Sequence, residues 1–112
     1  MEEQKRKRLE AKGWKVGSPS DFLGLTEEEE KYIELRLILR ETVRESRKEK
    51  QLTQEELAQK VGSNQSRIAK MEAGDNSVSI DFIFRSLFAL GLNFEDLSKK
   101  LVESNIHRSR RV

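Results

Sequence analysis

The chain has 112 residues, of which 35% are hydrophobic and 38% charged, so a single small domain with a lean core is expected. Its formal net charge of +2, with a pI near 9.0, is too small to indicate a nucleic-acid partner without a closer look at where the charges lie. The lack of cysteine excludes disulfides and thiolate zinc sites. No apolar run is long enough to cross a membrane, and the first residues lack the apolar region of a signal peptide. A cytoplasmic protein is therefore expected.

Residues 1–25 are predicted to form a charged N-terminal arm with a short apolar latch. The basic run at residues 5–8 is typical either of a DNA-binding arm or of a solvated tail. A brief apolar patch at residues 14–16 precedes Pro19, the only proline, and residues 22–25 need a surface to cover. We expect this arm to pack on the next helix or on a partner.

A long helix is predicted from residue 26 to about residue 50. Thr26 can cap it, Glu29 completes a capping box, and the acidic run at residues 27–30 suits the positive end of the helix dipole. The same run also has the composition of a metal site or an acid–base pair, but no histidine stands near it.

The apolar pattern of this helix predicts that its first half is covered on two sides. Ile33 and Leu37 point nearly opposite to the main apolar face. We expect these two side chains to be covered by the N-terminal arm, by a second copy of the chain or by another protein. The main face is formed by Tyr32, Leu35, Ile38, Leu39 and Val43.

Residues 52–74 predict two short helices joined by a tight turn. Thr53 and Glu56 form a capping box for the first helix, and Gly62 ends it because a residue without Cβ can adopt a positive φ. Ser63 or Asn64 caps the second helix, which ends at Gly74.

The apolar residues of these two helices indicate a helix-turn-helix motif. The small Ala58 allows a close crossing, and Ile68 and Met71 point inward. In such a motif the second helix enters the DNA major groove. The alternative is an ordinary helical hairpin within an all-α core.

Two further helices follow the motif. Ser79 caps the first of them, and Phe82 lies off its apolar stripe, which makes Phe82 a candidate for an interface. Gly91 stops this helix. The predicted stripe consists of Ile80, Ile83, Phe84, Leu87 and Phe88.

The last helix is predicted at residues 93–103, with Asn93 as its cap. Residues 104–112 are predicted to be a fraying basic tail, and the single histidine in it, His107, suggests neither a metal site nor a catalyst. The inward or dimer-facing residues of the helix are Phe94, Leu97 and Leu101.

The segment LTQEELAQKVGSNQSRIAKMEAG resembles the corresponding segment of lambdoid phage repressors, members of the Cro-type helix-turn-helix regulators (the xenobiotic-response-element family). The resemblance is strong over residues 39–90. It implies an all-α, lambda-repressor-like DNA-binding domain of five helices at residues 26–103, with the motif at about 53–73 and residues 1–25 as an N-terminal extension. More loosely, Trp14-Lys15-Val16 leading into DFLGL and an acidic helix start resembles HigA-type antitoxins.

The second helix of the motif carries the expected contacts to double-stranded DNA. With Ile68 and Met71 inward, its outward side is formed mainly by small residues, which lets the backbone approach the groove floor. Arg67 and Lys70 depart from the expected phage-repressor pattern, so the operator sequence does not transfer, and a solvated basic face is the alternative. Base reading is expected from Gln65, Ser66 and Lys70. Backbone contacts are expected from Thr53, Gln54, Asn64 and Arg67.

These features predict a sequence-specific transcriptional regulator that acts as a repressor, with an autoregulating antitoxin as the narrower version. A homodimer is expected, because one motif makes few contacts with DNA. The last helix is the first candidate for the dimer interface, and the two-sided part of the long helix is the second. In the antitoxin version, a cognate toxin would dock at Ile33 and Leu37. The alternative is a protein-interaction module that has lost DNA binding. The sequence has no nucleophile–base set, metal cluster or phosphate loop, so neither an enzyme nor a cofactor is expected.

Overall fold

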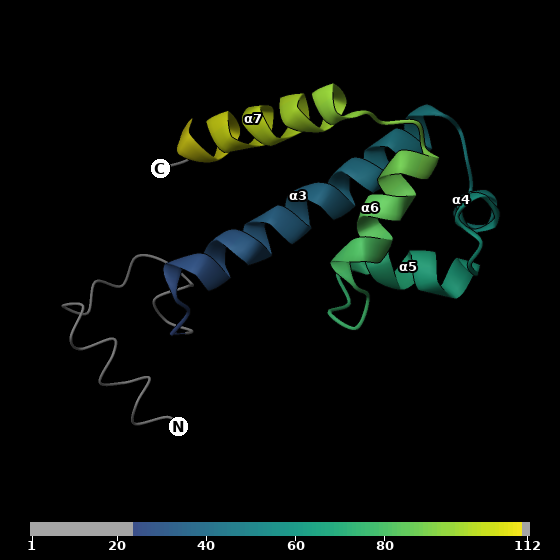
Figure 1. Cartoon of the computed structure of the whole chain (residues 1–112), viewed down its shortest axis with the longest axis horizontal. Coiled ribbons are helices and arrows are strands. Elements are labelled where there is room, and N and C mark those ends of the chain that lie inside the picture. Colours follow the sequence, from purple (N-terminus) through teal and green to yellow (C-terminus); the bar gives the residue numbers. More distant parts are fainter. Residues whose placement is uncertain (1–23, 111–112) are drawn as a thin grey trace. The chain divides into compact units, whose positions relative to one another are not determined.

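The computed structural model describes residues 24–110, with side chains from 24 to 104, and every regular element in this part of the chain is an α-helix (Figure 1). The expected all-α fold is therefore confirmed. Predictions for the basic run and the apolar patch of the N-terminal arm fall outside the described residues. The helices are α3 (Glu27–Glu49), α4 (Gln54–Val61), α5 (Gln65–Ala73), α6 (Ile80–Ala89) and α7 (Phe94–Arg110).

The chain divides into two compact units, residues 1–34 and 35–112. In the first unit, the predicted start of α3 is confirmed. The Glu29 backbone N–H donates to Thr26 Oγ1, and the Thr26 N–H donates to Glu29 Oε1, each at 3.1 Å. This reciprocal pair satisfies two N–H groups that have no partner within the helix.

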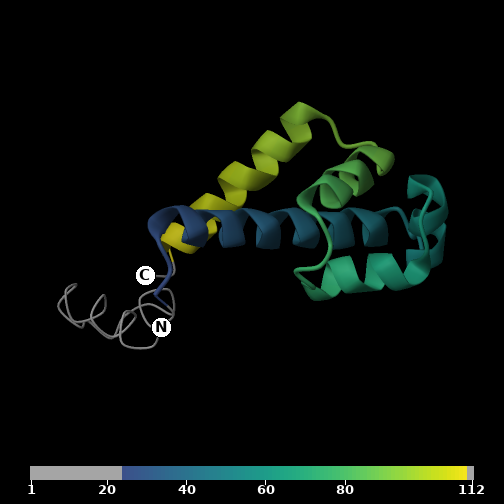
Figure 2. The same cartoon turned by 60° about the horizontal axis from the view of Figure 1, so that its bottom comes forward.

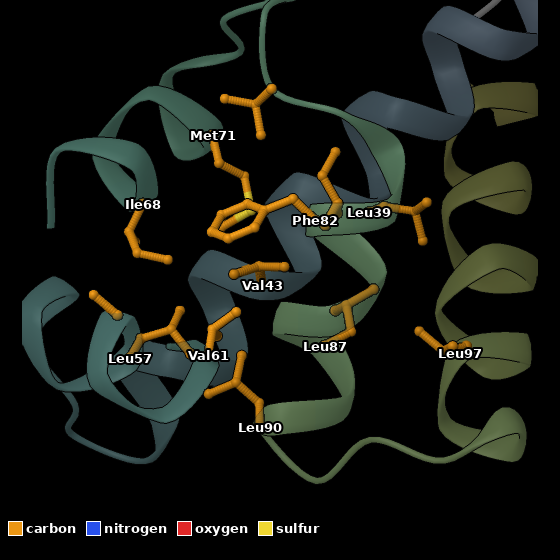
Figure 3. Close-up of a cluster of buried hydrophobic side chains, with 13 residues drawn as sticks. Leu39, Val43, Leu57, Val61, Ile68, Met71, Phe82, Leu87, Leu90 and Leu97 are labelled. Carbon is orange, nitrogen blue, oxygen red and sulfur yellow. The ribbon is translucent and has the colours of Figure 1, made fainter. Parts of the chain in front are cut away.

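The second unit is built around the C-terminal half of α3, with α4, α5 and α6 grouped around it (Figure 2). Apolar side chains from all these helices and from α7 meet in one core (Figure 3). Burying each large aliphatic or aromatic side chain contributes about 1.5–3 kcal/mol, so this core holds the motif helices in place. Its members are Leu39, Val43, Leu57, Ala58, Val61, Ile68, Met71, Val78, Phe82, Ile83, Leu87, Leu90 and Leu97.

The predicted caps and turns of the motif are confirmed. Thr53 Oγ1 accepts from the Glu56 N–H at 3.0 Å, while Glu56 Oε1 accepts from the Thr53 N–H at 2.9 Å. Gly62 has φ +77° and Gly74 has φ +85°, a region that glycine adopts without steric cost. Asn64 is the cap of α5, since its Oδ1 accepts from the Arg67 N–H at 2.9 Å.

The predicted apolar stripe of α6 is confirmed for Ile83 and Leu87, which lie in the core, and for Ile80 and Phe84, which pack against it, but it is wrong for Phe88 and omits Phe82. Phe82 is 2% exposed and lies in the core, whereas Phe88, predicted to face inward, is 46% exposed. Phe82 is therefore not an exposed interface residue. The polar Ser86 conceals the true stripe in the sequence, because its hydroxyl donates to the Phe82 carbonyl at 2.9 Å and is thus satisfied inside the core.

The helix α7 starts as predicted and runs further than predicted. Asn93 Oδ1 accepts from the Asp96 N–H at 2.8 Å, and Asp96 Oδ2 accepts from the Asn93 N–H at 3.0 Å. The helix continues to Arg110, beyond the expected end near residue 103, because no glycine or proline interrupts this stretch. The expected tail is thus helical as far as Arg110, and the side chain of His107 falls outside the described residues.

Candidate nucleic-acid interface

The outward face of α5 presents polar side chains to solvent. Gln65, at the first residue of the helix, is exposed, as are Ser66 and Lys70, while Ile68 and Met71 are buried in the core. This burial follows from the helical period, since residues three apart share a face. In the structure, the three side chains predicted to read bases are therefore exposed and accessible to DNA.

A hydrogen bond connects the starts of the two motif helices. Gln65 Nε2, on α5, donates to Gln54 Oε1, on α4, at 2.7 Å. Residues that were predicted to touch a base and a phosphate are thus in direct contact. Thr53 is exposed beside them, and its hydroxyl oxygen caps α4. The acidic Glu55 lies in the same shallow groove and weakens the positive field there.

A buried ion pair, which the sequence reasoning missed, supports this contact from below. Arg47 Nε donates to Glu72 Oε2 at 2.8 Å and Arg47 Nη2 to Glu72 Oε1 at 3.0 Å. Their side chains are only 11% and 6% exposed. Arg47 Nη1 also donates to the Leu52 carbonyl at 2.8 Å, and Gln54 Nε2 donates to Glu72 Oε1 at 3.1 Å. The pair therefore joins the end of α3, the start of α4 and the end of α5.

Arg67 lies on the flank of α5 and has a structural contact of its own. Its guanidinium carbon is 4.2 Å from the centre of the Phe82 ring, which is a cation–π geometry. Arg67 is nevertheless exposed, and with Asn64, Ser66 and Lys70 it lines a shallow depression. The depression brings two cations next to the α5 N-terminus, whose first turn has no acidic residue, an arrangement that favours an anion.

The turn after α5 places a carboxylate near Lys70. The Ser77 backbone N–H donates to Asp75 Oδ1 at 2.8 Å, and this bond, assisted by the charge of Lys70, holds the pKa of Asp75 below its usual value. Asp75 is fully exposed, so water screens its attraction to Lys70. The ammonium group of Lys70 therefore stays available at the surface.

The predicted interface residues differ in accessibility. Ile33 is 50% and Phe94 81% exposed, while Leu37 and Leu101 are half-buried. Leu97 is packed in the core of its own chain, so it is not available to a partner.

Aromatic rings form a cluster over α6 and α7, defined by the exposed Phe88 and Phe94 and the half-buried Phe84. The Phe84 and Phe88 rings are stacked with centroids 6.3 Å apart, and the Phe88 and Phe94 rings meet edge-on at 6.2 Å. Sequence reasoning found Phe94 but assigned Phe88 to the core.

Among the described side chains, no group of three acidic, histidine or cysteine residues is arranged to hold a metal ion. Within the same part of the chain, no helix is long and apolar enough to span a membrane.

Comparison with known families supports the motif. Residues 43–97 match the family model described as Helix-turn-helix, a stretch that runs from the second half of α3 into α7 and makes up just under half of the chain. A search of curated proteins and a search of solved structures found no significant match. The family match supports a DNA-binding transcriptional regulator, and it includes every residue of the candidate interface on α4 and α5.

Proposed function

We propose that this helix-turn-helix regulator is a sequence-specific repressor that blocks a promoter by occupying it. The α5 helix enters the major groove, and the N-termini of α4 and α5 hold the flanking phosphates. The observation that supports the proposal is the Gln54–Gln65 hydrogen bond, which joins an exposed amide at the start of α5 to the start of the preceding helix. Base contacts come from Gln65, Ser66 and Lys70, and backbone contacts come from Thr53, Gln54, Asn64 and Arg67.

The chemistry of the exposed side chains supports these roles. A glutamine amide pairs with adenine through one donor and one acceptor, and a lysine donates to guanine O6 and N7. The half-exposed Ala69 is small and lets α5 approach the groove floor.

The experiment is site selection from a random DNA pool followed by affinity measurements on the selected duplex. Replacing Gln65 or Lys70 by alanine is expected to cost about 1–3 kcal/mol and to relax preference at one position each. Lys60→Ala is the matched control, since Lys60 is an exposed lysine on α4. If the double variant Gln65→Ala/Lys70→Ala binds the selected site as tightly as the wild type, the assignment of the reading helix is wrong.

Arg67→Ala separates phosphate contacts from base contacts. A phosphate contact predicts weaker binding to all sequences alike and a salt slope reduced by about one. Because Arg67 also covers Phe82, the unfolding temperature of the variant is measured alongside. A change in base preference would instead make Arg67 a reading residue.

The proposed repressor is a homodimer that binds two half-sites about one helical turn apart. The aromatic cluster of Phe84, Phe88 and Phe94 supports a second copy as its cover, because exposed contiguous aromatic surface is typical of interfaces. Phe88→Ser/Phe94→Ser is expected to dissociate the dimer in sedimentation experiments at tens of micromolar, while Tyr32→Ser, an exposed aromatic outside the cluster, is not. A monomeric wild type would contradict this proposal.

The narrower proposal is that the repressor is an antitoxin that regulates its own operon. The half-exposed Ile33 on the first turns of α3 offers an apolar side chain to a toxin. A small basic nuclease-like reading frame beside the gene, whose product is neutralised by the wild type and not by Ile33→Glu, is the expected result. A gene without such a neighbour favours a stand-alone regulator.

A further inference from the structure

A cleft lies between the end of α3 and the first turns of α7, inside the second unit. The connection from α6 to α7 also lines this cleft, and Leu90 and Leu92 form its apolar part. Its volume is about 310 Å³, which suits one small molecule. No residue of α4 or α5 is among those that line the cleft, so it is separate from the candidate DNA surface.

The hydroxyl group of Ser46 reaches this cleft without a hydrogen-bond partner. Ser46 is 7% exposed and lines the cleft from α3. The other two buried hydroxyl side chains in the described part of the chain, Thr42 and Ser86, each donate to the backbone carbonyl four residues earlier. Ser46 Oγ makes no such bond among the described residues, and none of their fully enclosed polar side-chain atoms lacks a partner. The remaining exposure of Ser46 Oγ is therefore toward the cleft, where a ligand can satisfy it.

Charged side chains of both signs surround the cleft. They are Glu49, Lys50, Asp96, Lys99, Lys100 and Glu103. No two of them form an ion pair with each other, since Lys100 pairs with Glu45 at 3.6 Å. Lys99 pairs with Glu95 at 3.9 Å, and neither of these two partner carboxylates lines the cleft. The lining is therefore neutral in total and offers both signs to a ligand.

These features select a ligand by its charges. A cation alone would leave the lysine side chains of the cleft unpaired, and an anion alone would leave the carboxylates unpaired. Most of the charged side chains are exposed, so each attraction is weak and a ligand has to use several of them at once. A small molecule that carries both charges and an apolar part matches the hydroxyl group, the two signs and the leucine side chains together.

We propose that the cleft binds an α-amino acid with an aliphatic side chain. The carboxylate of the ligand accepts from the Ser46 hydroxyl and meets Lys50, whose Nζ lies beside the α6–α7 connection, 3.5 Å from where a Cβ on Gly91 would be. The ammonium group meets the acidic side chains of the cleft, and the aliphatic part packs on Leu92. The inference goes beyond the proposed repressor function and does not depend on it.

The bound amino acid would tie α7 to α3. Leu97 is the one residue of α7 in the hydrophobic core of the described part of the chain. A ligand that contacts both helices adds a second connection, and it binds the folded state alone. Binding is therefore expected to raise the melting temperature.

The test titrates the full chain with L-leucine, L-isoleucine and L-valine, one at a time and at constant ionic strength. Amide chemical shifts in ¹H–¹⁵N NMR spectra follow the binding. At least one of the three is expected to bind with a dissociation constant of about 1 mM or lower. The shifted amides are expected within residues 46–50, 90–92 and 96–103. No binding at millimolar concentration, or shifts confined to other residues, overturns the inference.

Two analogues of the tightest of these amino acids test the need for both charges. For L-leucine they are 3-methylbutylamine, which lacks the carboxylate, and 4-methylpentanoate, which lacks the ammonium group. Each analogue is expected to bind about tenfold more weakly than the amino acid, because one sign of the lining is then unsatisfied. If either analogue binds as tightly as the amino acid, the cleft is not a zwitterion site and the inference is overturned.

Ser46→Ala tests the buried hydroxyl directly, with Ser98→Ala as its matched control. Ser98 is an exposed serine on α7 that does not line the cleft. Ser46→Ala is expected to weaken binding about tenfold, since it removes a hydrogen bond to a charged group, whereas Ser98→Ala is expected to leave binding unchanged. Because Ser46 Oγ has no partner among the described residues, the unligated Ser46→Ala variant is expected to keep the wild-type melting temperature. Binding by Ser46→Ala as tight as by the wild type overturns the inference.

Discussion

Removing one partner of the Arg47–Glu72 ion pair is expected to destabilise the second unit severely. In Arg47→Met the Glu72 carboxylate, 6% exposed, stays in the interior without its cation, which costs about 3–5 kcal/mol. The Leu52 carbonyl also loses its donor, for about 1 kcal/mol more. Small domains have free energies of unfolding of about 5–15 kcal/mol, so much of the total is lost.

The double variant Arg47→Met/Glu72→Met tests the cause. Because both charges are then gone and apolar side chains of similar length fill the space, most of the free energy of unfolding is expected to return, leaving a deficit of about 1–2 kcal/mol from the Leu52 carbonyl and imperfect packing. Urea unfolding followed by circular dichroism measures all variants, and a double-mutant cycle gives the coupling energy.

An exposed ion pair in the same chain is the control. Glu95 and Lys99 are 3.9 Å apart on α7, with side chains 77% and 69% exposed. Breaking this pair is expected to cost no more than about 0.5 kcal/mol. The reasoning is refuted if Arg47→Met costs as little as this control, or if the double variant is as unstable as the sum of its two single variants.

Further predictions concern backbone conformation and pH. Gln51 has φ +58° at the end of α3, so Gln51→Gly is expected to raise the free energy of unfolding by about 0.5–1 kcal/mol, measured by thermal unfolding; a lower stability would contradict the strain argument. Gly62→Ala is expected to lower it by about 1–2 kcal/mol from backbone conformation alone, because no atom lies within 4 Å of the added Cβ; an unchanged melting temperature would speak against this. The pKa of Asp75 is lowered in the folded state, so its hydrogen bond from Ser77 stabilises the fold above the unfolded pKa of 3.8 and this contribution is lost as the pH falls through the folded pKa. The difference in melting temperature between wild type and Asp75→Asn is therefore expected to shrink in acid, and a difference independent of pH would exclude this linkage.

The accessible part of the candidate site was predictable because it follows from one helical period. Once Ile68 and Met71 are taken as inward, Ser66 and Lys70 have to point outward, and the structure has them exposed. Gln65, three residues before Ile68, is exposed as the first residue of the helix. Their contacts with DNA remain predictions. The supporting ion pair was not predictable in this way, because a glutamate next to Met71 has the same pattern as one on a solvated face.

The amino-acid sequence by itself determined where the described helices begin and how the motif turns. Each of those signals is a contact within a few residues, such as the Thr53–Glu56 capping box or the left-handed Gly62. Only the tertiary structure decided that Phe82 is buried on α6 while Phe88 is exposed, and which cation meets Glu72. The edge of the buried face of α6 depends on the surface it packs against, and Arg47 lies 25 residues from Glu72 along the chain. A pattern of neighbouring residues cannot predict a contact between residues so far apart in the sequence. The packing of α3 against α5 and α6 therefore determines both the buried side chains of α6 and the partner of Glu72.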